Sequence, residues 1–535
     1  MQMQIEDIFM TGATTPAPLR NAAFCSIWSS AQVANLRWLV QTVAIGWLMV
    51  TITASDLTVA LVQASTTLPA FILSIIADTH SRRSVMIIGL SLIALASVAL
   101  AGAAAFGFLS PWLILALGFI AGCGFALNDP AWHASVGDIP AAVTLMSTGY
   151  TMTRSVGPAL GGVILAFLGP LAAFLFSACS NLAPLAAVLR NKWHARPSPL
   201  PAERMSTAIR DGIRFTALSS DIRATIMRAT LFGLAAIAIL ALLPLVARDR
   251  LADDPIAYGV LFAGFGTGAC VAGLNNRLLR QEWLMAIASI ACAVCCISLA
   301  FTSSVPSATL ALAFGGAGWI ITWTGFDVWV QLASPRWVVG RTLSIYYAFL
   351  SGGMAAGSWI WGNVAQSYSL ASSLELAAAA LLLVAASGLV LQVHLGAEGD
   401  QQGAVFPAPS VALDLKPQSG PIAARTEYSL DESDLDSFFD HMRTRRYALA
   451  RAGARDWTLQ RNLRKPSHWT ETFRTPAWMS FRRLHHRLSR SDQDVSQLLA
   501  ALHLSEKPAE TELVIERTTD ARRTRSHPVP RVLRP

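Results

Sequence analysis

Hydrophobic residues form long blocks along the first three quarters of the chain, and short polar or Gly/Pro clusters separate these blocks. A helix needs about 20 mostly apolar residues to cross the hydrocarbon core of a bilayer. The pattern predicts twelve membrane-spanning helices, at residues 23–50, 57–77, 84–108, 111–135, 142–167, 170–190, 225–247, 256–275, 283–302, 306–332, 341–366 and 371–394. The polar stretch after the sixth block divides them into two halves of six.

The last quarter of the chain has a different pattern. Residues 395–423 are rich in Gly, Pro, Gln and Ala and predict a linker. Period-2 and helical patterns then predict the order β-α-β-β-α-β, typical of a small ferredoxin-like α+β domain over residues 424–518. The expected elements are a strand at 426–429, a helix from 431 to about 452, strands at 456–462 and 468–474, helices at 477–488 and 491–502, and a strand at 512–517. We expect residues 519–535 to be disordered.

The composition agrees with a membrane protein and excludes a soluble enzyme. Hydrophobic residues make up 53% of the chain and charged residues only 14%, against about 25% in an ordinary soluble domain. Residues 1–394 hold 19 Lys+Arg and 15 Asp+Glu, whereas residues 395–535 hold 22 and 18, so the charge is concentrated in the tail. The net charge of +8 is divided evenly, at +4 for each part, which indicates no nucleic-acid partner.

Basic residues in the loops predict the orientation, because Lys and Arg are enriched on the cytoplasmic side. Fifteen of them, including Arg228 and Arg341, fall on one side, and only Arg248 and Arg250 on the other. The prediction places both termini in the cytoplasm, as segments 1–19 (N-terminal), 20–190 (first half), 191–224 (loop), 225–394 (second half) and the tail. Residues 207–218 of the loop predict an amphipathic helix on the membrane surface.

Several stretches resemble one family. SIIADTHSRR (74–83) resembles the loop after the second span of the major facilitator superfamily, and RSVGPALGG (154–162) resembles its exporter-associated GPxxGG motif. The stretches LRWLVQTVAIGW (36–47), QLASPRWVVGR (331–341) and GGMAAGSWIWG (352–362) resemble its enterobactin-exporter-like, transmembrane secretion effector branch, as do the tail's TEY (426–428), RAGARDW (451–457) and Trp478. The resemblance implies a secondary transporter that exports a small organic solute, and we expect a monomer in the bacterial inner membrane.

The resemblance also implies roles for two groups of residues. Asp78, Arg82 and Arg83 would form a cytoplasmic gate in which the carboxylate pairs with arginine and a facing helix end. Positive-inside anchoring explains the two arginines but not Asp78. The span 5 motif would seal the interface between the halves with small residues, which let membrane helices approach closely; it consists of Arg154, Gly157, Pro158, Gly161 and Gly162.

Polar and charged residues inside the spans are costly and therefore indicate function. The candidates for substrate or proton binding are Arg37, Gln41, Asp129, Trp323, Asp327 and Gln331. A structural charge network among Arg37, Asp129 and Arg154 is the alternative for those three. Trp323 and Gln331 lie at i−4 and i+4 from Asp327, a stripe suited to an aromatic or polyol-bearing solute. A carboxylate partly removed from water could load and release a proton, so a proton-coupled exporter is expected.

The tail offers an alternative function, a membrane-tethered enzyme or sensor. An active tail should carry a nucleophile with its base or a metal cluster, and the sequence indicates neither: His468, His485 and His486 lack acidic or cysteine companions at ligand spacing. The seven cysteines all lie in apolar stretches and predict buried small side chains. No Walker A sequence occurs. We therefore expect no enzyme activity, no metal and no cofactor.

Overall fold

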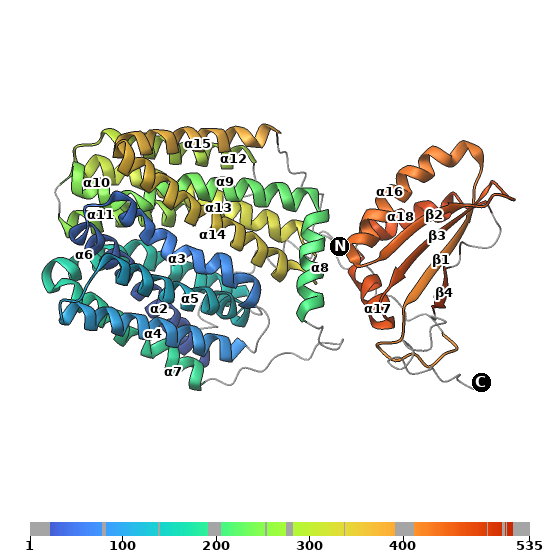
Figure 1. Ribbon diagram of the computed structural model, residues 1–535, viewed down its shortest axis with the longest axis horizontal. Helices are drawn as coiled ribbons and strands as arrows, with labels where there is room; N and C mark the ends of the chain where they lie inside the picture. Colours follow the sequence, from blue (N-terminus) through green and yellow to red (C-terminus); the bar gives the residue numbers. More distant parts are fainter. Residues whose placement is uncertain are drawn as a thin grey trace. The chain divides into compact units, whose positions relative to one another are not determined.

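The computed structural model describes two compact units (Figure 1). The first contains residues up to 202, 224–330 and 343–393, and the second contains 203–223, 331–342 and everything from 394 onward. The structure describes residues 22–77, 82–136, 140–190, 205–251, 254–273, 282–335, 337–390, 411–488, 490–504, 509 and 511–516. The predicted N-terminal segment 1–19 and the predicted disordered tail 519–535 lie outside these residues.

The first unit is a bundle of long helices. Its N-terminal half comprises α2 (Ala22–Ile52), α3 (Asp56–Ala77), α4 (Arg82–Ala105), α5 (Pro111–Val136), α6 (Pro140–Ser180) and α7 (Leu182–Arg190). Its C-terminal half comprises α9 (Ser220–Ala241), α10 (Leu243–Arg250), α11 (Pro255–Gly273), α12 (Glu282–Phe301), α13 (Val305–Ala333), α14 (Val339–Ser367) and α15 (Leu370–Val390). The two halves contact each other where α6 packs along α11.

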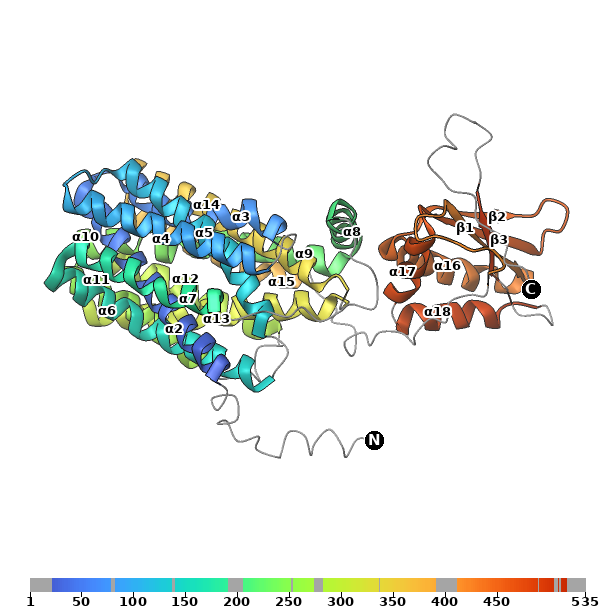
Figure 2. The same cartoon turned by 90° about the horizontal axis from the view of Figure 1, so that it is seen from below.

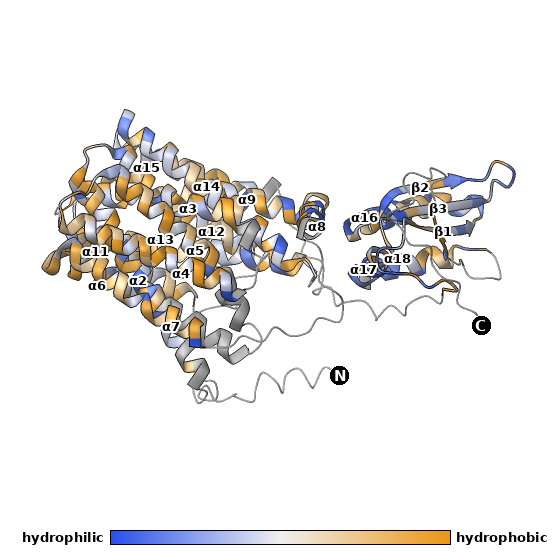
Figure 3. Ribbon diagram, turned by 60° about the horizontal axis from the view of Figure 1, so that its bottom comes forward, coloured by the Kyte–Doolittle hydropathy of each residue, from blue (hydrophilic) through white to orange (hydrophobic). Residues whose placement is uncertain are grey.

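The helices of the first unit are apolar on their outer faces as well as inside. Hydrophobic residues colour much of their ribbons in Figure 3, and Leu95, Phe314 and Leu383 are each more than 60% exposed. Large apolar side chains remain exposed on a helix when lipid covers them. Ten stretches of the described helices are long and apolar enough to cross a membrane.

The ten stretches differ from the twelve predicted spans at two places. The predicted spans 142–167 and 170–190 are counted largely within one stretch, Val156–Arg190, although a residue with non-helical backbone angles divides the helix between them, where the sequence predicted the turn. Gly169 makes this turn with φ at 76°, a left-handed conformation that glycine adopts without a steric penalty. The other difference is α14, which corresponds to the predicted span 341–366 and is not among the ten.

The second unit contains a four-stranded antiparallel sheet with helices on one face (Figure 2). Its elements in chain order are β1 (Ile422–Ser429), η3 (Glu432–Asp434), α16 (Leu435–Ala452), β2 (Arg455–Arg461), β3 (His468–Thr475), α17 (Trp478–Arg487), α18 (Arg490–Ala501) and β4 (Thr511–Ile515). The strand order is β2-β3-β1-β4, and α16, α17 and α18 cover the same face. Alternate residues of β3 are buried, as expected for a strand with one covered face.

The tail domain begins earlier than the predicted residue 424. Strand β1 starts at Ile422, and Val411 and Leu415 pack against the cluster formed by Phe473, Phe481 and other core residues. The end of the predicted linker therefore contributes to the core. Two further segments belong to this unit, although both lie far from the tail in the sequence. They are α8 (Met205–Leu218) and residues 331–342.

Candidate functional site

Asp327 lies in the apolar helix α13 and accepts a hydrogen bond from a neighbouring helix. The hydroxyl of Tyr347, on α14, donates to Asp327 Oδ1 at 2.7 Å. The ring of Trp323 lies 6.5 Å from that of Tyr347 and stacks on Trp319 at 6.3 Å. The sequence predicted that Trp323 and Asp327 share a face, and both lie beside Tyr347. Gln331, one turn further along α13, is exposed and belongs to the second unit.

Arg228 is a buried cation that the sequence assigned wrongly. It was counted among the basic residues of the cytoplasmic loops, but it is 2% exposed within α9. Its guanidinium carbon lies 5.7 Å from the ring centroid of Phe326 and 5.4 Å from that of Trp329. Aromatic faces attract a cation when water is excluded. The two rings flank Asp327 in the sequence, so α9 supplies a basic residue to the same part of α13.

The N-terminal half has a polar cluster of its own around Gln41. The Oε1 atom of Gln41 accepts hydrogen bonds from Ser97 Oγ at 2.9 Å and Ser177 Oγ at 2.6 Å, which joins α2, α4 and α6. Arg37, one turn earlier on α2, is 2% exposed, and its Nε and Nη1 atoms have no hydrogen-bond partner among the described residues. A buried cation is costly unless it is paired.

A small cavity opens beside this cluster. Residues of α2, α3 and α5 line it, and its polar lining comes from Gln41, Thr42, Gln63 and Thr66. Trp38 forms part of the wall and stacks on Phe125 at 4.7 Å. The cavity therefore combines an aromatic wall with uncharged polar groups.

The glycines of the span 5 motif lie where α6 meets two other helices. A Cβ atom on Gly157 would lie 2.8 Å from Leu39 on α2, and one on Gly161 would lie 3.1 Å from Val40. A Cβ atom on Gly162 would lie 2.8 Å from the Cα atom of Gly259 on α11. Pro158 is buried, and its carbonyl oxygen lies next to Gly259. Small residues thus allow the backbones of the two halves to approach closely.

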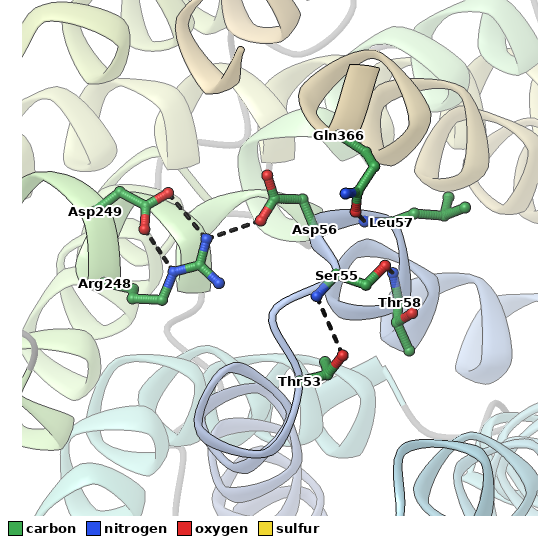
Figure 4. Close-up of polar contacts among 8 residues, drawn as sticks. All are labelled: Thr53, Ser55, Asp56, Leu57, Thr58, Arg248, Asp249 and Gln366. Atoms are coloured by element: carbon green, nitrogen blue, oxygen red, sulfur yellow. Dashed lines mark hydrogen bonds and ion pairs between the residues drawn. The ribbon is translucent and has the colours of Figure 1, made fainter. Parts of the chain in front are cut away.

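An ion pair connects the halves at one end of the bundle (Figure 4). Arg248 on α10 donates from Nη2 to Asp56 Oδ1 on α3 at 2.8 Å and also contacts the adjacent Asp249. Beside it, the backbone N–H of Leu57 donates to Gln366 Oε1 on α14 at 3.4 Å. These two contacts therefore join the halves at the end where α3 begins and α10 ends.

Several predicted residues are only partly described. Asp78 lies outside the described residues, and the side chains of Arg82, Asp129 and Arg154 are not described, although these three residues lie in α4, α5 and α6. Arg83 is exposed and donates from Nη2 to the carbonyl oxygen of Leu189 at 3.0 Å, so it connects α4 to the end of α7. The gate proposed for these residues stays a prediction.

The tail carries a buried charged group as well. Glu471 on β3 is completely buried, accepts from Arg445 Nε at 2.8 Å and accepts from Trp457 Nε1 at 2.8 Å. His485 packs against Phe481 at 4.6 Å between ring centroids, and burial lowers the pKa of His485 to about 4. The described residues hold no group of three or more potential metal ligands.

Sequence reasoning missed four residues of these sites: Asp56, Arg248, Tyr347 and, in its role, Arg228. Asp56 begins a helix, where an acidic residue is common, so nothing local distinguishes it. Arg248 was interpreted only as a loop charge. One signal was available for Tyr347, because a tyrosine within an apolar span needs a polar partner and Asp327 is the single acidic residue of the neighbouring predicted span.

Two groups of apolar helices, with polar residues inside each, are the arrangement of a transporter of the major facilitator type. The chain belongs to the transmembrane secretion effector family, whose model matches residues 13–521. It is therefore a multi-pass membrane protein. No curated protein matches the chain by sequence.

Solved structures show the same fold. The chain is similar to a POT family transporter in complex with a thioalcohol-conjugated peptide, at 11% identity and a TM-score of 0.56, over 70% of this chain and 96% of that one. It is also similar to the nucleoside transporter NupG, at 14% identity and a TM-score of 0.55, over 70% and 100%. The human organic anion transporter MFSD10 matches at 15% identity and a TM-score of 0.50, over 69% and 99%.

Proposed function

We propose that the protein is a proton-coupled exporter that moves a small organic solute, such as a siderophore, drug or metabolite, across the bacterial inner membrane. The observation that carries this proposal is Asp327, a carboxylate in an apolar helix held by Tyr347 beside stacked tryptophans. An intramembrane carboxylate is expensive, and proton relay is a common reason for keeping one. The aromatic rings offer flat surfaces to a solute with a ring system.

The topology that goes with this function has twelve spans and both termini in the cytoplasm, as the basic loops indicate. In that orientation the pair Asp56–Arg248 lies at the outer end, so its contacts belong to a state in which the halves are joined on the outer side. Asp78, Arg82 and Arg83 would then close the cytoplasmic end in the opposite state. Arg154 and Asp129 stay candidates for the charge network near Arg37. The tail is a ferredoxin-like domain, an assignment supported by its β-α-β-β-α-β order, and the transporter acts as a monomer.

Arg37 and Gln41 supply the recognition in the N-terminal half. The buried guanidinium would favour an anionic or strongly polar group on the solute, and Gln41, Thr42 and Gln63 would offer hydrogen bonds to its hydroxyl groups. Trp323 on the other half would stack on the same solute. One solute molecule would then contact both halves while they move relative to each other.

The test uses purified protein in proteoliposomes. Aromatic and polyol-bearing solutes are screened for transport driven by an imposed pH step. Asp327→Asn keeps the shape and hydrogen-bonding capacity but removes the titratable proton. This variant should retain exchange of labelled for unlabelled solute, since exchange needs no net proton movement, and should lose the response to the pH step.

A matched control is Glu375→Gln, which neutralises an exposed carboxylate on α15 in the same half. This variant should keep both exchange and the pH response. Full pH-driven transport by Asp327→Asn would refute the proton role of Asp327, and Asp129 would become the next candidate.

A further inference from the structure

The tail domain shares a compact unit with two segments that belong to the membrane part of the sequence. These segments are α8 and residues 331–342, which connect α13 to α14. Helix α8 has apolar residues on one side and Arg210, Asp211 and Arg214 among the others. Contacts between α8 and α16 bring the helix against the domain. The second unit thus contains an internal docking surface, formed by α8 and residues 334–342, whose occupant is the tail domain.

The centre of this contact is Arg487, at the end of α17. Its Nη1 atom donates to Asp211 Oδ2 on α8 at 2.7 Å and to the carbonyl oxygen of Ala452 at 3.1 Å. Its guanidinium carbon lies 4.2 Å from the ring centroid of Trp337. The Arg487 and Asp211 side chains are only 8% and 13% exposed. Ion pairs with so little exposure are costly to break, because one buried charge then loses its partner.

A second set of contacts extends the surface on both sides of Arg487. Arg214 on α8 donates to the carbonyl oxygen of Ala454, two residues after the end of α16. The ring of Phe215 meets Trp337 edge to face at 5.6 Å. A Cβ atom on Gly212 would lie 2.9 Å from Arg341, so α8 fits closely against the first turn of α14. Trp337 therefore lies between a side chain of α8 and one of the tail domain.

The two segments that contact the tail domain are directly connected to helices of the membrane part. Ser219 alone separates α8 from α9, the helix that carries Arg228, and residues 331–342 join the helices that carry Asp327 and Tyr347. A domain held on both segments limits how far the connected helix ends can move. Alternating access requires such movement of one half relative to the other.

We propose that the tail domain is a built-in clamp on the loop between α13 and α14, and that its release speeds transport. The inference rests on the proposed function for its effect on rate, and on the contacts of Arg487 for its mechanism. Docking opposes the movement of α13 and α14, and the Arg487–Asp211 pair is the contact that holds the domain in place.

The experiment measures hydrogen–deuterium exchange and transport on the same full-length variants. Asp211→Arg and Arg487→Asp each place like charges opposite one another. Each should raise amide exchange in α8 and in residues 339–345 by at least about tenfold, and should raise the transport rate. The exchanged pair, Asp211→Arg with Arg487→Asp, should restore both quantities in part, because it re-forms the ion pair but not the contacts of Arg487 with Trp337 and the Ala452 carbonyl. Trp337→Ala, which leaves the tail domain unaltered, should have the same direction of effect.

Arg482→Asp makes the same charge change earlier on α17 and should leave both readouts at their wild-type values. Unchanged exchange in α8 for both charge reversals would overturn the docking. Raised exchange with an unchanged transport rate would overturn the clamp. If the wild-type protein transports none of the solutes, the proposed function fails, whereas exchange at residues 339–345 still decides whether the domain restrains the loop.

Discussion

The ion pair between Asp56 and Arg248 offers the sharpest test of how the two halves close. Asp56→Asn removes the negative charge from the start of α3 but keeps an oxygen that can accept a hydrogen bond. Arg248 retains Asp249 as a partner within α10. The substitution therefore weakens the connection between the halves and leaves the individual helices intact.

The size of the effect follows from the burial of the pair. The side chains of Arg248 and Asp56 are 24% and 19% exposed, between a surface pair worth about 0–1 kcal/mol and a buried pair that costs about 3–5 kcal/mol to break. The remaining hydrogen-bond acceptor and Asp249 place the loss near the lower end, at about 1 kcal/mol. A change of that size shifts an equilibrium about fivefold, so the population open at this end should rise about fivefold.

Spin labels measure this opening directly. With the seven natural cysteines replaced, spin labels at Thr53→Cys and Ile256→Cys mark this end of each half. Double electron–electron resonance then gives the distribution of distances between the two labels. The fraction at longer distance should increase about fivefold in Asp56→Asn. Asp249→Asn is the matched control, because it removes a contact of the same arginine that does not cross between the halves.

Two outcomes would refute the reasoning. An unchanged distance distribution in Asp56→Asn would mean that the pair does not hold the halves together. An equal shift in Asp249→Asn would mean that the conformation of Arg248, and not its contact with Asp56, controls the closed state.

Three further predictions concern packing, buried charge and pH. Gly162→Ala places a Cβ atom 2.8 Å from Gly259 Cα. It should abolish transport and increase the distance between the spin labels. Gly102→Ala adds a Cβ atom with nothing within 4 Å and should change neither quantity. Glu471→Gln leaves Arg445 without its charged partner and should destabilise the tail domain by about 3 kcal/mol in denaturant unfolding; Glu427→Gln, exposed on β1, is its control. The folded domain lowers the pKa of His485 to about 4, so the unfolded chain binds a proton at a higher pH than the folded domain does. The free energy of unfolding should therefore fall from about pH 6.5 towards pH 4, by up to about 3 kcal/mol. His485→Leu should flatten this pH dependence, as measured by thermal unfolding.

The helices of both units were predictable within a few residues, because strong physical constraints set their ends. A bilayer of fixed thickness requires apolar runs of one length, and the predicted span 283–302 corresponds to α12 at Glu282–Phe301. In the tail, the helix predicted at 477–488 is α17 at Trp478–Arg487. The break predicted between residues 167 and 170 lies at Gly169, whose non-helical backbone divides α6.

The candidate site was only partly predictable, since its contacts join residues far apart in the sequence. Asp327 was found because its cost inside an apolar span is a local property. Its partner Tyr347 lies on the next helix, α14. The rotation of α14 about its own axis decides whether Tyr347 faces Asp327, and the amino-acid composition of the helix does not determine that rotation. Arg228 shows the opposite error: a basic residue near a predicted boundary looked like a loop anchor, yet the aromatic rings of Phe326 and Trp329 hold it in the interior.

Helix α14 connects the proposed clamp of the tail domain to the contacts that join the two halves of the bundle. It begins at Val339 within the second unit, where the tail domain contacts Trp337, and it ends beside Gln366, which accepts from Leu57 of the other half. Its 29 residues span about 43 Å at a rise of 1.5 Å per residue. Gly362, near its end, meets Ala60 of α3 so closely that a Cβ atom would lie 2.6 Å away. Because a helix is stiff along its axis, a clamp on its first turn also biases the contacts at its last turn.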